Sequence, residues 1–527
     1  MSEPGRDGSG DAGLGARTGL DAGASGGAPQ DVALSLVSHT NAGKTTLART
    51  LLARDVGEVR DAAHVTAAAE RHPMIETATG DTLSLWDTPG FGDSARLARR
   101  LANLDSPILG FLAATWDRWR DRPFWSSQQA VRNVRECADV VLYLVNASER
   151  PQDAGYLAPE IRILEWIGKP VVVLLNQTGP PRSPADEAAD VARWRDALGA
   201  RPMIRGVVTL DAFARCWVQE RMLLQVVADA LPVSKAAAFA RLASAWTAAR
   251  ELQFEEAMAA IAQPIGRAAC DRENLPVAGF RESLRGVGKV IGIRGGGGEG
   301  ATKTAMTALA QRLDADIRAS TDRLIAVHQL QGRAAAEVTA RLADSVVTEA
   351  PVDERKAAIV GGFLSGALTG LAADLAAGGL TFGAGLLAGG VVGALGAAGA
   401  ARGFNLVRGT TEASLRWGDD FVAALVPAAI LRYLAVAHYG RGRGAWTAGE
   451  HPALWRDVVT AAIARHPRLS SSPPWAQRAG GCDPDRIAAQ VAAMLAEVTR
   501  EVLATLYPAT RSRDDPQRPN NSSAGGG

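Results

Sequence analysis

Between residue 32 and about residue 230, short apolar segments alternate with segments whose apolar residues recur at helical spacing. Polar residues, glycine or proline bound the apolar segments, which is typical of buried central strands. Strands that alternate with amphipathic helices predict an α/β fold with a doubly wound, mainly parallel sheet that helices cover on both faces. The predicted strands are residues 32–38, 82–87, 140–146, 171–176 and 206–210.

After residue 232 the pattern changes to long alanine-rich helices, of which 234–262 and 302–348 are the clearest. No segment here has a strand pattern of comparable strength. A glycine run at 295–298 resembles a phosphate loop, but no Gly-Lys-Thr follows it, so we interpret it as a flexible linker. The second part of the chain is therefore predicted to be mostly α-helical.

Within this part, residues 357–401 contain a single charged residue, Asp374, and small residues at four-residue spacing. Each half is long enough as a helix to cross a hydrocarbon core of about 30 Å, and small residues let two helices approach closely. Basic residues such as Arg355 and Arg402 flank the segment, which would keep both ends in the cytoplasm. We predict a glycine-rich apolar hairpin that anchors the chain in a membrane. A buried hairpin of a soluble protein is the alternative, because alanine and glycine contribute little to insertion.

The composition narrows the class of protein. A formal net charge of +1 gives no overall field to attract a polyanion, so composition does not indicate a nucleic-acid partner. The cysteines form no CxxC pair, which argues against a zinc site and a disulfide framework and favours a reducing cytoplasm. The N-terminus has no basic start followed by an apolar run, so we expect no cleavable signal peptide. The four cysteines are Cys137, Cys216, Cys270 and Cys482.

Between the first predicted strand and an apolar helix lies the sequence SHTNAGKTT, residues 38–46, and this setting makes a P-loop signature meaningful. Backbone N–H groups of such a loop point at phosphate oxygens, Lys44 bridges the β- and γ-phosphates, and the Thr45 hydroxyl binds Mg²⁺. Ser38 replaces the first glycine of the signature. The predicted phosphate-binding residues are Asn41, Ala42, Gly43, Lys44, Thr45 and Thr46.

A second motif, Asp-Thr-Pro-Gly at 87–90, ends the predicted strand 82–87. Here Asp87 would hold Mg²⁺ through water, and the backbone N–H of Gly90 would meet the γ-phosphate. The two motifs together predict a site for a nucleoside triphosphate and its metal.

With Asn41 in the P-loop, the Asp-Thr-Pro-Gly motif and the strand that ends at Asn176, residues 30–230 resemble the Era-like branch of bacterial GTPases. The resemblance implies a switch that binds GTP with Mg²⁺. It also implies that Asn41 could help coordinate a monovalent cation such as K⁺. The order of such a domain and a helical region with an apolar hairpin resembles bacterial GTPases fused to a C-terminal domain of unknown function.

The guanine-reading motif of that branch is Asn-Lys-x-Asp, and the corresponding residues here are 176–179, Asn-Gln-Thr-Gly. Asn176 would support the base pocket, but Gly179 stands where the aspartate would accept two hydrogen bonds from guanine. Losing that carboxylate weakens the discrimination against adenine. Asp211, in the turn that follows the last predicted strand, could compensate.

The threonine that closes over Mg²⁺ is assigned to Thr66 by its position between the two motifs, and Thr77 and Thr79 compete for this role. Phe91 follows Asp-Thr-Pro-Gly at the place where Ras-type enzymes carry a water-positioning glutamine. Hydrolysis of GTP, with Lys44 and Thr66 as the catalytic residues, should therefore be slow unless a partner, self-association or a bound cation assists it.

We thus expect a slow GTPase switch whose helical part couples the nucleotide state to a membrane or a protein partner, in the cytoplasm at the inner face of the cell membrane. The alternative is a non-catalytic, nucleotide-binding membrane scaffold with relaxed base specificity. The predicted organisation is a disordered tail at 1–29, a GTPase domain at 30–232, a helical domain at 233–507 that contains the hairpin 357–401, and a disordered tail at 508–527.

Overall fold

The computed structural model describes residues 28–40, 42–52, 69–102, 121–179, 182–212, 216–275, 297–330, 404–408, 413–439, 453–476 and 482–508. Asn41, Thr66, the hairpin 357–401 and most of both predicted tails lie outside these ranges. In chain order the elements of the sheet domain are β1 (Asp31–Ser38), α1 (Lys44–Leu52), β2 (Glu70–Glu76), β3 (Thr82–Asp87), α2 (Ser94–Ala102), α4 (Arg122–Cys137), β4 (Val140–Asn146), α5 (Leu157–Ile167), β5 (Val171–Asn176), α6 (Pro184–Leu198), β6 (Ile204–Thr209) and α7 (Trp217–Ala230).

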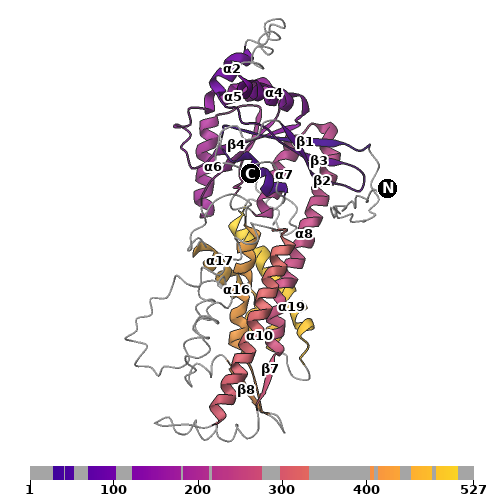
Figure 1. Cartoon of the computed structure of the whole chain (residues 1–527), viewed down its shortest axis with the longest axis vertical. Helices are drawn as coiled ribbons and strands as arrows, with labels where there is room; N and C mark the ends of the chain where they lie inside the picture. Colours follow the sequence, from indigo (N-terminus) through magenta and orange to yellow (C-terminus); the bar gives the residue numbers. More distant parts are fainter. Residues whose placement is uncertain are drawn as a thin grey trace, which may run out of the picture.

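Six strands form the sheet of the first domain, in the order β2-β3-β1-β4-β5-β6 (Figure 1). All neighbours pair in parallel except β2, which is antiparallel to β3. The predicted doubly wound, mainly parallel sheet is confirmed, and four of the five predicted strands match within one residue. The fifth strand begins two residues earlier than predicted, at Ile204.

The sequence analysis missed strand β2 (Glu70–Glu76). Its residues are mostly exposed or half-buried, and it contains Pro73 next to a shift in register. A proline is tolerated in an edge strand because it has no N–H to donate to a second neighbour. An exposed edge strand also lacks the continuous apolar run that identifies the central strands.

Each face of the sheet has its own apolar core. Alternate residues of β4 point to opposite faces, as the pleat requires: Leu142 joins one core and Tyr143 the other. Helices α1 and α7 and the first part of a long helix, α8 (Val233–Cys270), cover the Leu142 face. Helices α2, α4, α5 and α6 cover the Tyr143 face.

Below the sheet in Figure 1 stands a bundle of long helices, and α8 belongs to both parts. Its Phe239 and Trp246 pack in the core under the sheet, whereas Phe254 and Ile261 pack in the core of the bundle. With 38 residues, α8 is about 57 Å long. The other elements of the bundle are α10 (Gly297–Val327), α16 (Asp419–Ala437), α17 (Ala453–Arg465), α18 (Pro467–Ser471), the 3-10 turn η1 (Pro474–Ala476) and α19 (Pro484–Leu506).

The prediction that the second part of the chain is mostly α-helical is confirmed, with two differences in detail. Three short strands, β7 (Arg272–Leu275), β8 (Phe404–Arg408) and β9 (Ala413–Trp417), form an antiparallel sheet in the order β7-β9-β8, where no strands were predicted. They are four or five residues long, so no period could be read from them. The glycine run predicted as a linker also overlaps α10, which begins at Gly297.

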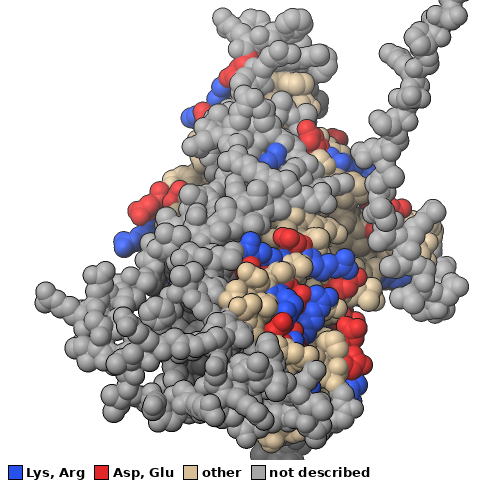
Figure 2. All heavy atoms as spheres, turned by 60° about the horizontal axis from the view of Figure 1, so that its bottom comes forward, with Lys and Arg blue, Asp and Glu red and all other residues tan. Residues whose placement is uncertain are grey.

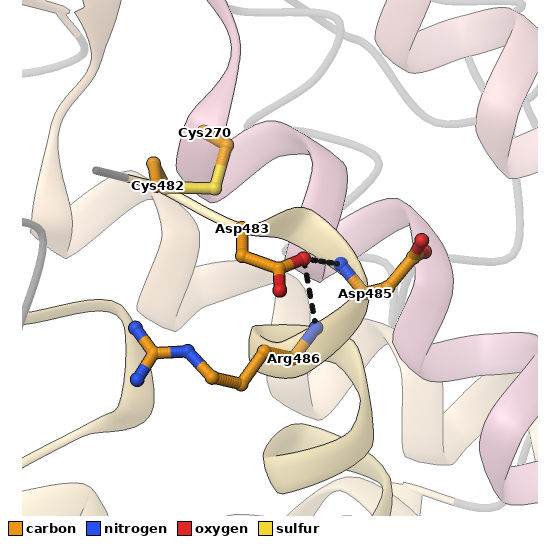
Figure 3. The surroundings of a disulfide bond; sticks show 5 residues. All are labelled: Cys270, Cys482, Asp483, Asp485 and Arg486. Carbon is orange, nitrogen blue, oxygen red and sulfur yellow. Dashed lines mark hydrogen bonds between the residues drawn. A yellow bond between two sulfur atoms is a disulfide. The ribbon is translucent and has the colours of Figure 1, made fainter.

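A disulfide joins Cys270 at the end of α8 to Cys482 just before α19, so the expectation that the cysteines form no disulfide is wrong for this pair (Figure 3). The two helices approach closely: a Cβ on Gly266 would lie 2.5 Å from the carbonyl oxygen of Pro484. Asp483 caps α19 by accepting hydrogen bonds from the backbone N–H groups of Asp485 and Arg486, at 3.0 and 3.2 Å. Since 212 residues separate the two cysteines, only the folded bundle brings them together.

Helix α16 is the one described helix whose length and composition would allow it to cross a membrane. Val422, Ile430 and Leu434 of this helix are fully buried in the core of the bundle. Burial of this kind also accounts for its apolar character, so α16 is weak evidence for a membrane span.

Charged side chains of both signs are interspersed over the described residues on the face that Figure 2 shows. Among the described residues of the bundle, Arg267 of α8 pairs with Asp316 of α10 at 2.5 Å and Arg312 with Asp271 at 3.0 Å. Such exposed pairs contribute only about 0–1 kcal/mol each, so the apolar core between the helices carries most of the stability of the bundle.

Candidate nucleotide-binding site

The loop between β1 and α1 places Lys44 at the first position of the helix, directly after Gly43, whose φ is +87°. Glycine adopts this conformation without strain, which lets the chain turn sharply from the strand into the helix. The Lys44 Nζ donates a hydrogen bond to the Ser38 Oγ at 3.0 Å, and the side chain is almost entirely buried. Burial lowers the pKa of Lys44, while Asp87 and Glu160 act in the opposite direction. The ammonium group thus lies in a desolvated loop where an anion would stabilise its charge.

The predicted metal ligands meet at the carboxyl ends of β1 and β3. The Thr45 Oγ1 donates a hydrogen bond to the Asp87 Oδ2 at 2.7 Å, whereas the Asp87 Oδ1 is buried and accepts no hydrogen bond from the described residues. Burial raises the pKa of Asp87, and the Thr45 hydroxyl and the charge of Lys44 oppose this shift. A buried carboxylate oxygen without a donor fits a divalent cation, which would supply the missing positive partner.

Among the described residues, no group of three or more His, Cys, Asp or Glu side chains could hold a metal ion. Mg²⁺ does not need such a cage, because it usually keeps several waters and takes one or two protein oxygens together with phosphate oxygens of the nucleotide. The Thr45–Asp87 pair has the composition expected of such a site.

The second motif lies against the P-loop. A Cβ on Gly90 would lie 3.2 Å from both the Lys44 Nζ and the Thr40 Cα, so this position has little room for a side chain. The Phe91 N–H donates a hydrogen bond to the Ser38 carbonyl oxygen at 3.0 Å, while the Phe91 ring is buried in the core beneath α2 and α4. Phe91 therefore packs the protein interior and offers no polar group to a water molecule.

Asn176, the last residue of β5, connects three segments of the site. Its Nδ2 donates a hydrogen bond to the Ala42 carbonyl oxygen at 2.8 Å, and its Oδ1 accepts one from the Ala212 N–H, also at 2.8 Å. The side chain is fully buried. The structure thus places the predicted base-pocket residue where it ties the P-loop to the loops after β5 and β6.

The next loop contains Gln177, Thr178 and Gly179. Gly179 has a φ of +81°, and no atom of the described residues lies within 4 Å of the place a Cβ would take. The Asp211 Oδ2, from the loop after β6, accepts hydrogen bonds from the Thr178 backbone N–H at 2.8 Å and from its Oγ1 at 3.0 Å. A carboxylate therefore lies beside this loop, although it comes from a different segment than the motif predicts.

Sequence reasoning missed a network behind the P-loop. The His39 Nδ1 lies 2.8 Å from the Glu160 Oε1, and the Tyr143 hydroxyl donates to the Glu160 Oε2 at 2.7 Å. The His39 ring also stacks on Tyr156, with centroids 4.5 Å apart. Burial raises the pKa of Glu160, and the bonds from His39 and Tyr143 oppose the shift. The signal that could have revealed it is a charged residue on the apolar face of α5, between Leu157 and Leu164.

The structure argues against two of the three candidates for the switch threonine. Thr77 and Thr79 lie in the turn that precedes β3 and form hydrogen bonds with each other and with Asp81. Asp87 lies at the opposite end of β3, about 17 Å along the strand. Neither threonine can thus share a metal ion with Asp87, and Thr66 lies outside the described residues.

Two family models match the chain. The model described as a 50S ribosome-binding GTPase matches residues 33–177, and the model of the domain of unknown function DUF3482 matches residues 195–496. The N-terminal resemblance to GTPases and the C-terminal domain of unknown function are thereby confirmed. The first match includes the P-loop, the Asp-Thr-Pro-Gly motif and Asn176.

Solved structures similar to the chain are GTP-binding proteins. Era from Aquifex aeolicus, bound to GDP and AlF4⁻, is 20% identical, with a TM-score of 0.26, over 38% of this chain and 57% of that one. Era in complex with MgGDPNP and nucleotides of 16S ribosomal RNA is 20% identical, with a TM-score of 0.25, over 39% of this chain and 58% of that one. A probable GTP-binding protein, engB, is 14% identical, with a TM-score of 0.24, over 38% of this chain and 100% of that one.

The chain spans less than two thirds of the length of the Era structures. No curated protein matches it at a significant level. The assignment of the GTPase domain therefore rests on the family model and on the geometry of the loop around Lys44.

Proposed function

This chain belongs to the family of proteins defined by the domain of unknown function DUF3482, and we propose that it is a GTP-binding switch that hydrolyses GTP slowly. The observation that carries the proposal is the meeting of Lys44, Thr45 and Asp87 in one desolvated site at the carboxyl ends of β1 and β3. These are the side chains that hold phosphates and their metal ion in a P-loop protein.

In this proposal the N–H groups of residues 43–46 and the Lys44 ammonium group hold the phosphates. Thr45 and Asp87 hold Mg²⁺, which would neutralise charge on the phosphate oxygens. Gly90 brings a backbone N–H close to Lys44, and Asn176 supports the loop beneath the base. Asn41 and Thr66 keep their proposed roles as ligands of a monovalent cation and of Mg²⁺.

Slow turnover is part of the proposal because Phe91 is buried where a water-positioning side chain would stand. In Ras-type GTPases, a side chain that orients the attacking water molecule contributes to the hydrolysis of GTP. A partner, self-association or a cation would then accelerate the reaction.

The second part of the proposal is that the bundle senses the nucleotide. It is supported by the ion pair between Arg241 of α8 and Asp81 in the turn before β3, with 2.7 Å between the Nε and Oδ2. Strand β3 leads from this turn to Asp87, and α8 leads from Arg241 into the core of the bundle. Movement at the metal site thus has a continuous packed route into the helical domain. Hydrogen exchange of α8 should change when a non-hydrolysable GTP analogue binds, and Arg241→Ala should reduce that change.

We further propose that the helical domain associates with a membrane through 357–401, at the cytoplasmic face. The support is the apolar character of that segment and the basic residues on both sides of it. Flotation of the full-length chain with lipid vesicles tests the idea. Recovery of the whole chain in the soluble fraction without detergent would exclude the anchor.

Phosphate release from Mg²⁺-GTP by the full-length protein tests the switch. We expect slow release that Lys44→Ala abolishes, together with nucleotide binding. Lys169→Ala is the matched control, because Lys169 precedes β5 at the opposite end of the strand from Asn176. Release that does not depend on Lys44 would refute the proposal.

Gly179 and Phe91 favour one second candidate, a non-catalytic scaffold that binds nucleotides with relaxed base specificity. It predicts Lys44-dependent binding of GTP and ATP alike without phosphate release. The same assay, run with both nucleotides, separates the two functions.

A further inference from the structure

The loop after β5 lacks the carboxylate that would read guanine. Gly179 occupies that position, with a positive φ and, in the described part of the chain, no atom within 4 Å of the place of a Cβ. A guanine-selective site needs a group that accepts hydrogen bonds from N1–H and the 2-amino group of the base, because adenine offers neither donor there. The question is whether another part of the described structure supplies this acceptor.

Asp211 lies in the neighbouring loop. Strands β5 and β6 are parallel, with Leu175 opposite Thr209, so the residues that follow them extend from the same edge of the sheet. The Asp211 side chain is buried, and its Oδ2 accepts hydrogen bonds from both the N–H and the hydroxyl group of Thr178. The two donors of Thr178 fix the carboxylate against the loop in which an aspartate is missing.

The adjacent residue connects this carboxylate to the phosphate site. The Ala212 N–H donates to Asn176, and Asn176 donates to the carbonyl oxygen of Ala42 in the P-loop. A ligand whose phosphates lie in the P-loop would extend its base along the carboxyl ends of β5 and β6, because ligands of such sheets bind outside that edge. Asp211 belongs to the lining of that edge.

We propose that Asp211 is the residue that determines guanine specificity and that Thr178 positions it. This inference rests on the proposed nucleotide binding and adds the identity of the base. The Asp211 carboxylate, which Thr178 holds in place, would accept hydrogen bonds from the base as well. Guanine N1–H and the 2-amino group donate to the same carboxylate, whereas adenine presents a lone pair at N1 that the carboxylate repels. A site built to pair with a donor rejects the analogue that lacks it.

Asp211→Asn is the decisive variant, because the side chain keeps its shape while one acceptor oxygen is replaced by a donor NH2 group. A carboxamide can donate to the C2 carbonyl oxygen of xanthine, which replaces the 2-amino group of guanine. Equilibrium titration of the full-length protein with Mg²⁺ and fluorescent GTP, ATP and xanthosine triphosphate should show that the wild type prefers GTP. In Asp211→Asn, the affinity for GTP should fall at least about tenfold, and xanthosine triphosphate should bind more tightly than GTP.

Thr178→Val is the companion variant. It removes the hydroxyl donor but keeps the shape and the backbone N–H, so it should weaken GTP binding without a gain for xanthosine triphosphate. Competition by Mg²⁺-tripolyphosphate, which has no base, should be unchanged in both variants and reports an intact phosphate site.

If Asp211→Asn weakens GTP, ATP and xanthosine triphosphate equally, Asp211 only stabilises the loop and the inference is wrong, while the nucleotide site stands. Equal affinity of the wild type for GTP and ATP would also overturn the inference alone. Failure of the wild type to bind any triphosphate, tripolyphosphate included, would overturn the proposed function with it.

Discussion

The amide nitrogen Nδ2 of Asn176 lies 2.8 Å from the place that a Cβ on Gly43 would take. The end of β5 and the P-loop are therefore in contact through a glycine, and the same amide holds the Ala42 carbonyl oxygen. The close approach and the positive φ of Gly43 both exclude a side chain at this position.

Gly43→Ala should therefore abolish measurable binding of Mg²⁺-GTP, because the methyl group displaces Asn176 and strains the loop. Gly199→Ala is the matched control: the φ of Gly199 is +67°, but no described atom lies within 4 Å of the added methyl group. With a ψ of 176°, Gly199 has a backbone conformation that essentially only glycine adopts, so we expect the variant to lower the free energy of unfolding by about 1–3 kcal/mol and to leave the affinity unchanged. Titration with GTP and chemical denaturation measure the two effects. Equal losses of affinity in both variants would contradict the role of the contact.

Glu160 competes with the nucleotide for the charge of Lys44, so Glu160→Gln should increase the affinity for Mg²⁺-GTP, by about threefold. The increase should grow as the pH is raised, because burial raises the pKa of Glu160 and the carboxyl group is ionised only towards higher pH. Titrations at several pH values measure it. Glu165→Gln on the same helix, where Glu165 forms an exposed pair with Arg201, should have no effect.

His39→Ala should act in the opposite direction, since it removes the ring that pairs with Glu160 and stacks on Tyr156. We expect lower affinity and lower stability. If Glu160→Gln weakens binding as His39→Ala does, the network serves only to hold the loop.

The ion pair between Arg241 and Asp81 should make stability depend on pH in acid. The hydrogen bonds from Arg241 lower the pKa of Asp81 to about 2 from 3.8. A group whose pKa is lower in the folded state stabilises that state above its unfolded pKa and loses this effect as the pH falls through its folded pKa. The contribution should thus be complete above about pH 4 and disappear as the pH falls towards 2.

Arg241→Ala should lower the free energy of unfolding at pH 7 more than the loss of an exposed pair does, because the Asp81 side chain is fully buried and would lose its charged partner. Arg201→Ala breaks the exposed pair with Glu165 and should cost less than about 1 kcal/mol. Urea denaturation at pH 7 and pH 3 checks both, and an unchanged pH profile in Arg241→Ala would contradict the assignment.

The disulfide between Cys270 and Cys482 predicts a thiol count. Denatured protein that has not been reduced should expose two reactive thiols per chain, Cys137 and Cys216, and reduction should raise the number to four. Cys482→Ala should destabilise the bundle by about 2–4 kcal/mol, because it releases a loop of more than 200 residues in the unfolded chain. GTP binding at the P-loop should be unaffected. Four reactive thiols without reductant would show that the bridge does not form.

The central strands and the P-loop could be predicted because their signals are local. The strand that ends at Ser38 is mostly apolar, and the turn to Lys44 contains the residues of the P-loop motif at fixed spacing. Strand β2 and the small sheet of the bundle could not be predicted, because they are short or exposed and their pairing partners are distant in sequence.

The sequence by itself determined that a parallel sheet carries a P-loop motif and an Asp-Thr-Pro-Gly motif, since periodicity and motif spacing act over a few residues. Only the tertiary structure decided that Asp211 lies on Thr178, that Glu160 reaches His39 and that α8 joins two cores. These contacts connect residues from different elements, and each depends on how the strands and helices pack. Packing can bring a side chain of one segment next to a second segment that has no such side chain. A local sequence pattern does not contain this information.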